Sequence, residues 1–269
     1  VHLTGYCLGG TLAAIHAAAL AREGDDSLAS LSLFAAQTDF TEAGELTLFI
    51  SEGEVDFLED LMWSVGYLDA NQMSGAFQIL RSNDLIWSRI QRHYLLGERA
   101  EPNDLMSWNQ DSTRMPYRMH SEYLHKLFLQ NDLANGRFEV DGAPIFLSDI
   151  RVPIFAVGTE TDHVAPWRSA YKIAALSDAD TTFVLTNGGH NAGVVSEPGH
   201  PHRHYRIRSH HHGNVHLSAD AWMRSAKVKE GSWWPEWTLW LGAHSGLKVA
   251  PPEMPVALCD APGTYVHMK

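Results

Sequence analysis

Thr4-Gly5-Tyr6-Cys7-Leu8-Gly9-Gly10 is the stretch that decides how this 269-residue chain folds. It follows a short apolar run at residues 1–3 and precedes an alanine-rich run at residues 11–22, which favours a helix ending near Gly24. Glycines two positions before and after Cys7 leave room for a sharp turn between a strand and a helix. The residue at the tip of such a turn is exposed, so the stretch predicts a nucleophilic cysteine.

Three further segments have the pattern of buried strands. Residues 30–36 alternate and then run apolar, residues 152–157 are almost wholly apolar, and residues 181–185 are β-branched and aromatic. A helix is predicted from Pro166 to about residue 176, with proline in its first turn. Strands that alternate with helices predict an α/β fold, and the position of the cysteine turn predicts the C-terminal part of an α/β-hydrolase sheet.

Residues 41–149 have a different character, helical and rich in aromatic residues. Apolar side chains recur at roughly helical spacing in residues 54–62, 75–80, 84–96 and 116–131. We therefore expect a hydrolase core made of residues 1–40 and 150–269, with residues 41–149 inserted as a helical lid that governs access to the active site. The alternative is a helical subdomain with only a packing role.

Composition limits the classes of partner. The net charge of −12, from 20 basic and 32 acidic residues, argues against non-specific binding of nucleic acid. The sequence has no apolar run of 18 residues, so we expect no transmembrane segment. Its two cysteines, Cys7 and Cys259, lie far apart, which is typical of a reducing, cytoplasmic compartment. Because the chain opens on an interior strand, we expect it to be the C-terminal part of a longer protein.

Two predicted strands end in loops with candidate catalytic residues. Asp162 follows the strand at residues 152–157, and His190 follows the strand at residues 181–185. The order Cys7, Asp162, His190 is the chain order of nucleophile, acid and histidine in this fold. His190 would deprotonate the cysteine, Asp162 would orient the imidazole, and the backbone N–H of Leu8 would stabilise an oxyanion. A second oxyanion donor would lie upstream of residue 1.

Three other carboxylates compete for the role of the acid. Asp149 precedes its strand and so lies at the wrong end of it, and Asp178 is the second competitor. Glu160 is the serious rival, because it lies in the same loop as Asp162.

Histidines are concentrated after the candidate base, at His200, His202, His204, His210, His211 and His212. Close histidines suggest a metal site, but no Cys, Asp or Glu lies among them, and the Pro, Arg and Gly content favours an exposed loop over residues 198–213 without a metal. Residues 232–241 predict a last helix, capped by Ser232 and packed on the sheet through Trp234, Trp237 and Leu241. The proline-rich residues 248–269 predict a loosely attached tail.

Seven segments together resemble polyhydroxyalkanoate synthases, over the region from the first residue to about residue 246. They are residues 5–11 (GYCLGGT), 83–87 (NDLIW), 108–111 (WNQD), 129–131 (LQN), 162–167 (DHVAPW), 189–193 (GHNAG) and 231–235 (GSWWP). The similarity covers the catalytic domain of that family.

The resemblance implies an acyltransferase that polymerises (R)-3-hydroxyacyl-CoA into a polyester and releases coenzyme A, with the growing chain held on Cys7 as a thioester. It implies no cofactor, places Trp108 near the nucleophile and His163 at the pocket edge, and suggests a homodimer on the surface of a cytoplasmic polymer granule. A cysteine-dependent hydrolase such as a thioesterase is the alternative enzyme, and a non-catalytic binding module with this fold is the other alternative.

Overall fold

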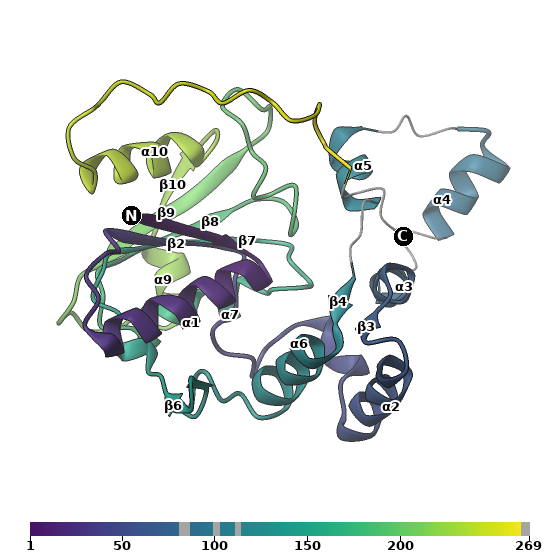
Figure 1. Ribbon diagram of the computed structural model, residues 1–269. Coiled ribbons are helices and arrows are strands. Elements are labelled where there is room, and N and C mark those ends of the chain that lie inside the picture. Colours follow the sequence, from purple (N-terminus) through teal and green to yellow (C-terminus); the bar gives the residue numbers. More distant parts are fainter. Residues whose placement is uncertain (81–86, 99–102, 111–113, 265–269) are drawn as a thin grey trace. The chain divides into compact units, whose positions relative to one another are not determined.

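The structure is a computed structural model that describes the chain except for residues 81–86, 99–102, 111–113 and 265–269 (Figure 1). The chain divides into two compact units. The first contains Val1–Glu52 and Tyr123–Gly246, and the second contains Gly53–Glu122 and Leu247–Lys269.

A six-stranded sheet forms the centre of the first unit, in the order β1-β2-β7-β8-β9-β10. The first four strands are parallel and the last two are antiparallel. The strands are β1 (His2–Tyr6), β2 (Ser30–Phe34), β7 (Ile154–Thr159), β8 (Thr181–Thr186), β9 (His204–His210) and β10 (Lys227–Glu230). Every residue of β2 and β7 is buried, as expected for central strands covered on both faces. The four parallel strands, with the sharp turn after the first, are consistent with the C-terminal part of an α/β-hydrolase sheet, and the antiparallel β9 and β10 extend it.

Helices cover both faces of this sheet (Figure 1). Leu31, Leu33 and Ile154 point into the larger apolar core, which packs against α1 (Leu8–Glu23), α7 (Trp167–Tyr171), α8 (Ile173–Leu176) and α9 (Ala219–Ser225). Phe34 and Phe155 point to the opposite face, where α10 (Trp234–Ala243) covers a second core. Successive strand residues therefore serve opposite cores, as the two-residue period requires.

Helix α1 confirms the expectation from its alanine content. Its small side chains, among them Ala14 and Ala18, are fully buried, which lets the helix lie close to the sheet. It ends at Gly24, whose φ of 73° is left-handed, and the N–H groups of Gly24 and Asp25 bond to the last turn.

The second unit is mainly helical. It holds most of α2 (Glu52–Trp63), then β3 (Tyr67–Leu68), α3 (Ala70–Leu80), α4 (Ser88–Ile90), the π-helix η3 (Gln91–Leu95), α5 (Asp104–Gln110), β4 (Met115–Pro116) and α6 (Tyr117–Glu122). The division between units leaves residues 123–149 with the sheet. The lid role expected for residues 41–149 stays a prediction.

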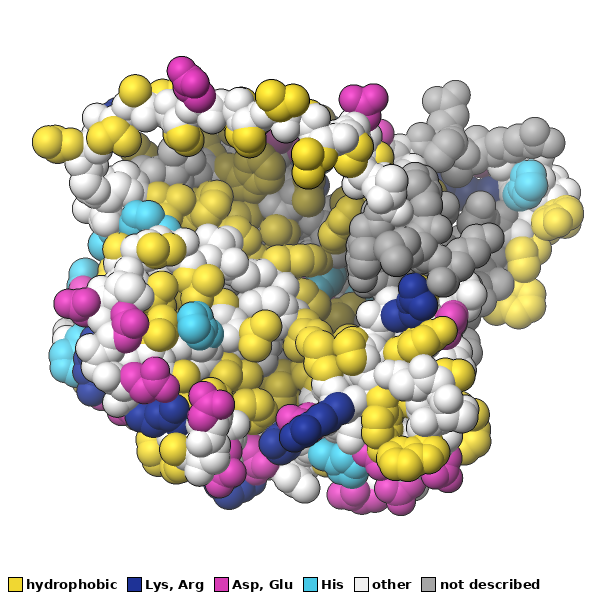
Figure 2. Space-filling model, viewed as in Figure 1, with side chains coloured by type: hydrophobic (Ala, Val, Ile, Leu, Met, Phe, Trp, Pro, Cys, Tyr) yellow, Lys and Arg dark blue, Asp and Glu magenta, His cyan; other side chains and the backbone are white. Residues whose placement is uncertain are grey.

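Short elements join these parts within the first unit. They are η1 (Glu45–Phe49), the π-helix η4 (Tyr123–Leu129), β5 (Glu139–Val140), β6 (Ala143–Pro144) and η5 (Leu147–Asp149). The tail has neither helix nor strand over residues 247–264, and Leu247, Val249, Met254, Val256 and Leu258 are exposed along it (Figure 2). Among the helices that the structure describes, none has both the length and the hydropathy to cross a membrane.

The prediction of an exposed loop over residues 198–213 is wrong for its second half, where β9 joins the sheet between β8 and β10. Tyr205 and Ile207 alternate with arginines and pack in the second core. This alternation is a strand signal, and the surrounding His, Pro and Gly residues hid it.

Candidate active site

Cys7 lies at a sharp turn between β1 and α1. Its backbone has φ 54° and ψ −126°, a conformation that a non-glycine residue rarely adopts, and its N–H bonds to the carbonyl oxygen of Phe34 at 2.8 Å. A Cβ on Gly5 would lie 2.3 Å from the carbonyl oxygen of Gly9, and one on Gly10 would lie 2.4 Å from the Cβ of Ala36. The two glycines are therefore needed for the helix to start this close to the strand.

Leu8 is the first residue of α1. The first N–H groups of a helix lack acceptors inside the helix and carry its positive dipole end. The position fits the predicted oxyanion donor next to the nucleophile, and that role stays a prediction.

Asp162 lies in the loop between β7 and α7, and its side chain is completely covered. One carboxylate oxygen, Oδ1, accepts the backbone N–H groups of Val164 at 2.9 Å and Ala165 at 2.8 Å. The other, Oδ2, accepts the hydroxyl of Thr159 at 2.9 Å and lies 2.8 Å from Nδ1 of His190. The carboxylate thus has a partner in every direction, which holds it in one orientation.

His190 interacts with both the acid and the nucleophile. Because an ionised carboxylate only accepts, Nδ1 of His190 donates to Asp162, and the other ring nitrogen remains for the hydrogen bond with Cys7. Burial lowers the pKa of His190, but the hydrogen bonds to Asp162 and Cys7 and their negative charges raise it by more, to about 10. The structure therefore brings together the three side chains predicted from the ends of β1, β7 and β8.

Two of the competing carboxylates have other partners, and the third lies before β7. Glu160 lies 3.7 Å from His204, and Asp178 lies 3.5 Å from Arg151. Asp149 lies in η5, before β7 begins. Of the four candidates, only Asp162 is hydrogen-bonded to His190.

Comparison with known proteins connects this site to a family. No protein-family model matches the chain. Over its whole length the chain is 38% identical to the poly(3-hydroxyalkanoate) polymerase subunit PhaC of Rhizobium meliloti, 39% identical to the poly(3-hydroxyalkanoate) polymerase of Methylorubrum extorquens and 35% identical to PhaC of Cupriavidus necator. The chain is a homologue of the poly(3-hydroxyalkanoate) polymerases. It spans 44%, 45% and 47% of these three relatives, which is less than half of each.

Among solved structures, an α/β fold family hydrolase from Bacillus anthracis overlaps 72% of this chain and 62% of its own, with 15% identity and a TM-score of 0.37. The fold assignment rests instead on the strand order and on the turn at Cys7.

Tyr6 and Asn191 are part of this site, and neither of them has a role predicted from the sequence. The ring of Tyr6 lies 5.1 Å from that of His190, and its hydroxyl donates to Oδ1 of Asn191 and, at 3.4 Å, to the carbonyl oxygen of His190. Burial, together with the negative charges of Cys7 and Asp162, raises the pKa of Tyr6 far above its usual range, so the phenol stays a donor. The signals in the sequence were the adjacency of each residue to a catalytic candidate and its place in the segments at residues 5–11 and 189–193.

Tyr123 also belongs to this environment. Burial and then the charge of Cys7 raise the pKa of its phenol, and its ring packs against Phe40 and Phe128. No motif marked this residue in the sequence.

The two predicted substrate-binding residues lie in different units. His163 directly follows the acid, is partly exposed, and its Nδ1 lies 3.2 Å from Oε1 of Glu45. Trp108 lies on α5 of the second unit with 54% of its surface exposed. Their contact with substrate stays a prediction.

The other resemblance segments and histidines have varied placements. The segment at residues 83–87 lies almost wholly outside the described residues, as does Asp111.

Two residues of the histidine-rich stretch lie near acidic side chains. His204 lies near Glu160, which follows β7, and His211 lies 3.2 Å from Asp180, which precedes β8. The prediction of a site without metal stays a prediction.

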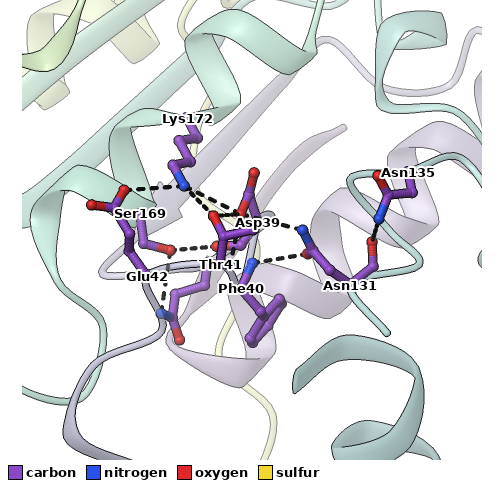
Figure 3. A network of polar contacts seen from close by, with 9 residues as sticks. Asp39, Phe40, Thr41, Glu42, Asn131, Asn135, Ser169 and Lys172 are labelled. Carbon is purple, nitrogen blue, oxygen red and sulfur yellow. Dashed lines mark hydrogen bonds and ion pairs between the residues drawn. The ribbon is translucent and has the colours of Figure 1, made fainter. Parts of the chain in front are cut away.

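Asp39 is a fifth carboxylate in this region, in the loop that follows β2 (Figure 3). It accepts hydrogen bonds from Thr41, from the Nδ2 of Asn131 at 3.3 Å and from Lys172 at 3.3 Å. Asn131 in turn accepts the backbone N–H of Phe40 at 2.9 Å. The segment at residues 129–131 therefore has a structural role: it fastens the loop after β2 to the returning chain.

Proposed function

We propose that the protein containing this chain is a polyhydroxyalkanoate synthase, an acyltransferase that polymerises (R)-3-hydroxyacyl-CoA and releases coenzyme A. The observation that carries the proposal is the hydrogen bond between His190 and Asp162 beside Cys7, which raises the pKa of His190, in a chain homologous to poly(3-hydroxyalkanoate) polymerases along its whole length. A thiol nucleophile with its own base and acid fits the transfer of acyl groups between thioesters.

In the first step the charged His190 already holds the proton of the Cys7 thiol, and the thiolate sulfur attacks the carbonyl carbon of the acyl-CoA. The bond from that carbon to the sulfur of coenzyme A then breaks, and the coenzyme A thiolate leaves with the proton from His190. One thioester replaces another, so the acyl group stays activated at almost no cost in free energy. The N–H of Leu8 would stabilise the oxyanion of the tetrahedral intermediate.

In the second step the 3-hydroxyl of another acyl group attacks the acyl thioester on Cys7. An oxygen ester forms, the carbon–sulfur bond breaks, and the hydroxyl proton passes to His190 and then to the sulfur. Asp162 is the alternative base, but its two oxygens already accept three donors besides His190, which favours the histidine. Water at this stage would release the chain as free acid, which gives a covering lid a purpose.

The remaining parts of the proposal concern partners and place. Trp108 and His163 contribute to binding the acyl-CoA, coenzyme A is a product, and the reaction needs no cofactor. The protein works as a homodimer at the surface of a polymer granule in the cytoplasm. These features come from the family resemblance.

The decisive test supplies the natural protein with (R)-3-hydroxybutyryl-CoA and measures both free coenzyme A and insoluble polymer. Equimolar release of coenzyme A with polymer is the expected result. Coenzyme A with only soluble 3-hydroxybutyrate would identify a thioesterase instead. Neither product would remove the proposed activity.

Cys7→Ala in the same assay should abolish both products, and a covalent acyl adduct on the Cys7 peptide should disappear with it. Cys259→Ser is the matched control, because Cys259 is an exposed free thiol in the tail. Normal polymer yield from Cys7→Ala would overturn the covalent mechanism.

A further inference from the structure

The loop that carries His190 is held from outside by four side chains that lie later in the chain. We name this group, Arg203, Ser232, Trp233 and Trp234, the histidine-loop clamp. Each member donates a side-chain hydrogen bond to a backbone carbonyl. Nη2 of Arg203 donates to Ala192 (2.6 Å), Nε1 of Trp233 to Gly193 (3.1 Å), Nε1 of Trp234 to Val194 (2.9 Å) and the hydroxyl of Ser232 to Ser196.

Within the loop, the N–H groups point inward. The N–H of Gly193 bonds to the carbonyl oxygen of Gly189 at 2.8 Å, and those of Val194 and Val195 bond to the carbonyl oxygen of Asn191 at 3.1 and 2.9 Å. The loop therefore closes on itself through its donors, while the carbonyls at 192, 193, 194 and 196 take their partners from the clamp. Buried carbonyls need such partners.

The clamp members are also tied to one another. The N–H of Gly231 bonds to the carbonyl oxygen of Arg203 at 2.7 Å, and the hydroxyl of Ser232 accepts the N–H of Trp234 at 3.1 Å. Trp233 is 1% exposed. A tryptophan has a large rigid ring with a single donor at its edge, so each indole can reach across a packed core to one carbonyl.

Trp233 also contacts the side of the site that holds the nucleophile. Its ring lies 5.1 Å from that of Phe34, and the carbonyl oxygen of Phe34 accepts the N–H of Cys7. The same indole thus touches the residue that supports Cys7 and the loop that supports His190.

We propose that the histidine-loop clamp positions the imidazole of His190 relative to Cys7 and Asp162. Its members are positioning residues, since they act through the backbone of the loop. The inference rests on the proposed role of His190 as the base for Cys7. If a clamp donor is lost, the loop and the imidazole shift, and a small displacement of a catalytic group costs much of the rate.

Trp234→Phe is the main variant, because it removes the Nε1–H and keeps an aromatic ring at a partly buried position. Trp237→Phe is the matched control. Trp237 belongs to the same helix and the same core, but its indole donates to the hydroxyl of Ser32 on β2 and not to the loop. Both changes cost one indole donor and keep an aromatic ring in the core that contains Phe34. The hydrogen bond to the histidine loop is the contact that Trp234 has and Trp237 lacks.

The readout is the rate at which iodoacetamide alkylates the Cys7 peptide as a function of pH, measured by mass spectrometry in a Cys259→Ser background. Alkylation displaces iodide from the reagent and forms a carbon–sulfur bond at Cys7, and its pH profile reports the Cys7–His190 pair. A His190→Gln variant gives the profile of a thiol without its base. Melting temperatures are measured for every variant.

We expect Trp234→Phe to move the profile towards that of His190→Gln and to lower kcat for coenzyme A release by about 10- to 100-fold, with KM little changed. Trp237→Phe should keep the original profile. If the two variants give the same profile, or if loss of rate follows only the melting temperature, the inference is wrong.

Ser232→Ala and Arg203→Lys keep the test open should Trp234→Phe fail to fold, because each removes or weakens another donor to the same loop. They should move the profile in the same direction, and an unchanged profile in both would overturn the inference. The alkylation needs no polymer chemistry. Failure of the synthase assay with a shifted profile would therefore reject the proposed function and leave the clamp standing.

Discussion

The acid and the histidine of the site are held in opposite ways. Asp162 receives its donors from Thr159, Val164 and Ala165, all within three residues of it. The loop of His190 takes its outer donors from the clamp, whose tryptophans lie 40 residues from the carbonyls they bind. The acid is therefore placed by a local turn, whereas the base is placed by tertiary packing.

The two loops should therefore respond differently to substitutions. A local turn survives changes elsewhere in the core, so the acid loop should fail only when its own residues change. The histidine loop should respond to substitutions far from the chemistry.

Asp162→Asn should have the largest effect. The amide oxygen can still accept the N–H groups of Val164 and Ala165, so the turn remains, but the amide nitrogen would donate to Nδ1 of His190 and favour the wrong tautomer. We expect kcat for coenzyme A release to fall by about 10²–10⁴-fold, with little change in melting temperature. Asp178→Asn, which removes only a surface ion pair, is the control. A comparable loss in that control would contradict the assignment of the acid.

The pH dependence of stability should report the charged histidine. The pKa of His190 is raised in the folded protein to about 10, from about 6.5 in an unfolded chain. The charged imidazole therefore contributes stability fully below about pH 6.5, and this contribution is lost as the pH rises through the folded pKa. As the pH rises from the unfolded to the folded pKa of His190, the free energy of unfolding of the original protein, compared with that of His190→Gln, should fall by a few kcal/mol. This is on the order of the pKa shift converted at about 1.36 kcal/mol per unit.

Urea unfolding at several pH values measures that difference. In a Cys7→Ala background the free energy of unfolding should fall over a narrower pH range, because Cys7 contributes to the raised pKa of His190. A difference between the two proteins that stays constant from pH 6 to 10 would show that His190 is not charged in the fold.

Gly193→Ala should damage the contact between the two loops. A Cβ there would lie 2.5 Å from Cγ2 of Thr159 and 2.9 Å from the carbonyl oxygen of Gly189. The histidine loop would have to move away from the acid, at a cost of about 1–3 kcal/mol in stability and about 10-fold or more in kcat. Thr159→Ser in the same protein removes Cγ2 and keeps the hydroxyl bond to Asp162, so partial recovery of kcat is expected. No recovery would place the strain at the carbonyl oxygen of Gly189 and at Cβ of residue 159, which serine keeps.

The same contrast explains what the sequence could predict. The turn at Cys7 and the strands β2, β7 and β8 follow from local patterns, because each depends on residues within a few positions of one another. The three catalytic candidates could be predicted because each follows one of the predicted strands in the chain order of this fold. The bonds from Trp233 and Trp234 to the histidine loop leave no such pattern. From sequence, those tryptophans predict only a packed helix face, and the alternation of Tyr205 and Ile207 in β9 lies between histidines that suggest a loop.

Ser232 illustrates the limit in one residue. The sequence predicts that it caps the last helix, and its hydroxyl does accept the N–H of Trp234. The cap residue itself is Trp233, and the Ser232 hydroxyl also donates to Ser196 in the histidine loop. Spacing along the chain indicates the first contact, whereas only the fold brings the second partner within reach.

Thr159→Val should have the smallest effect and gives the most direct comparison of the two loops. Valine keeps the shape of this fully buried side chain and removes the hydroxyl that donates to Asp162. We expect a loss of about 1.5 kcal/mol in stability, typical of a hydrogen bond to a charged group. The fall in kcat should be only about two- to five-fold, because the N–H groups of Val164 and Ala165 still orient the carboxylate. The measurement is kcat beside that of Trp234→Phe. A larger loss from Thr159→Val than from Trp234→Phe would mean that the acid, rather than the histidine, is the less firmly held member of the pair.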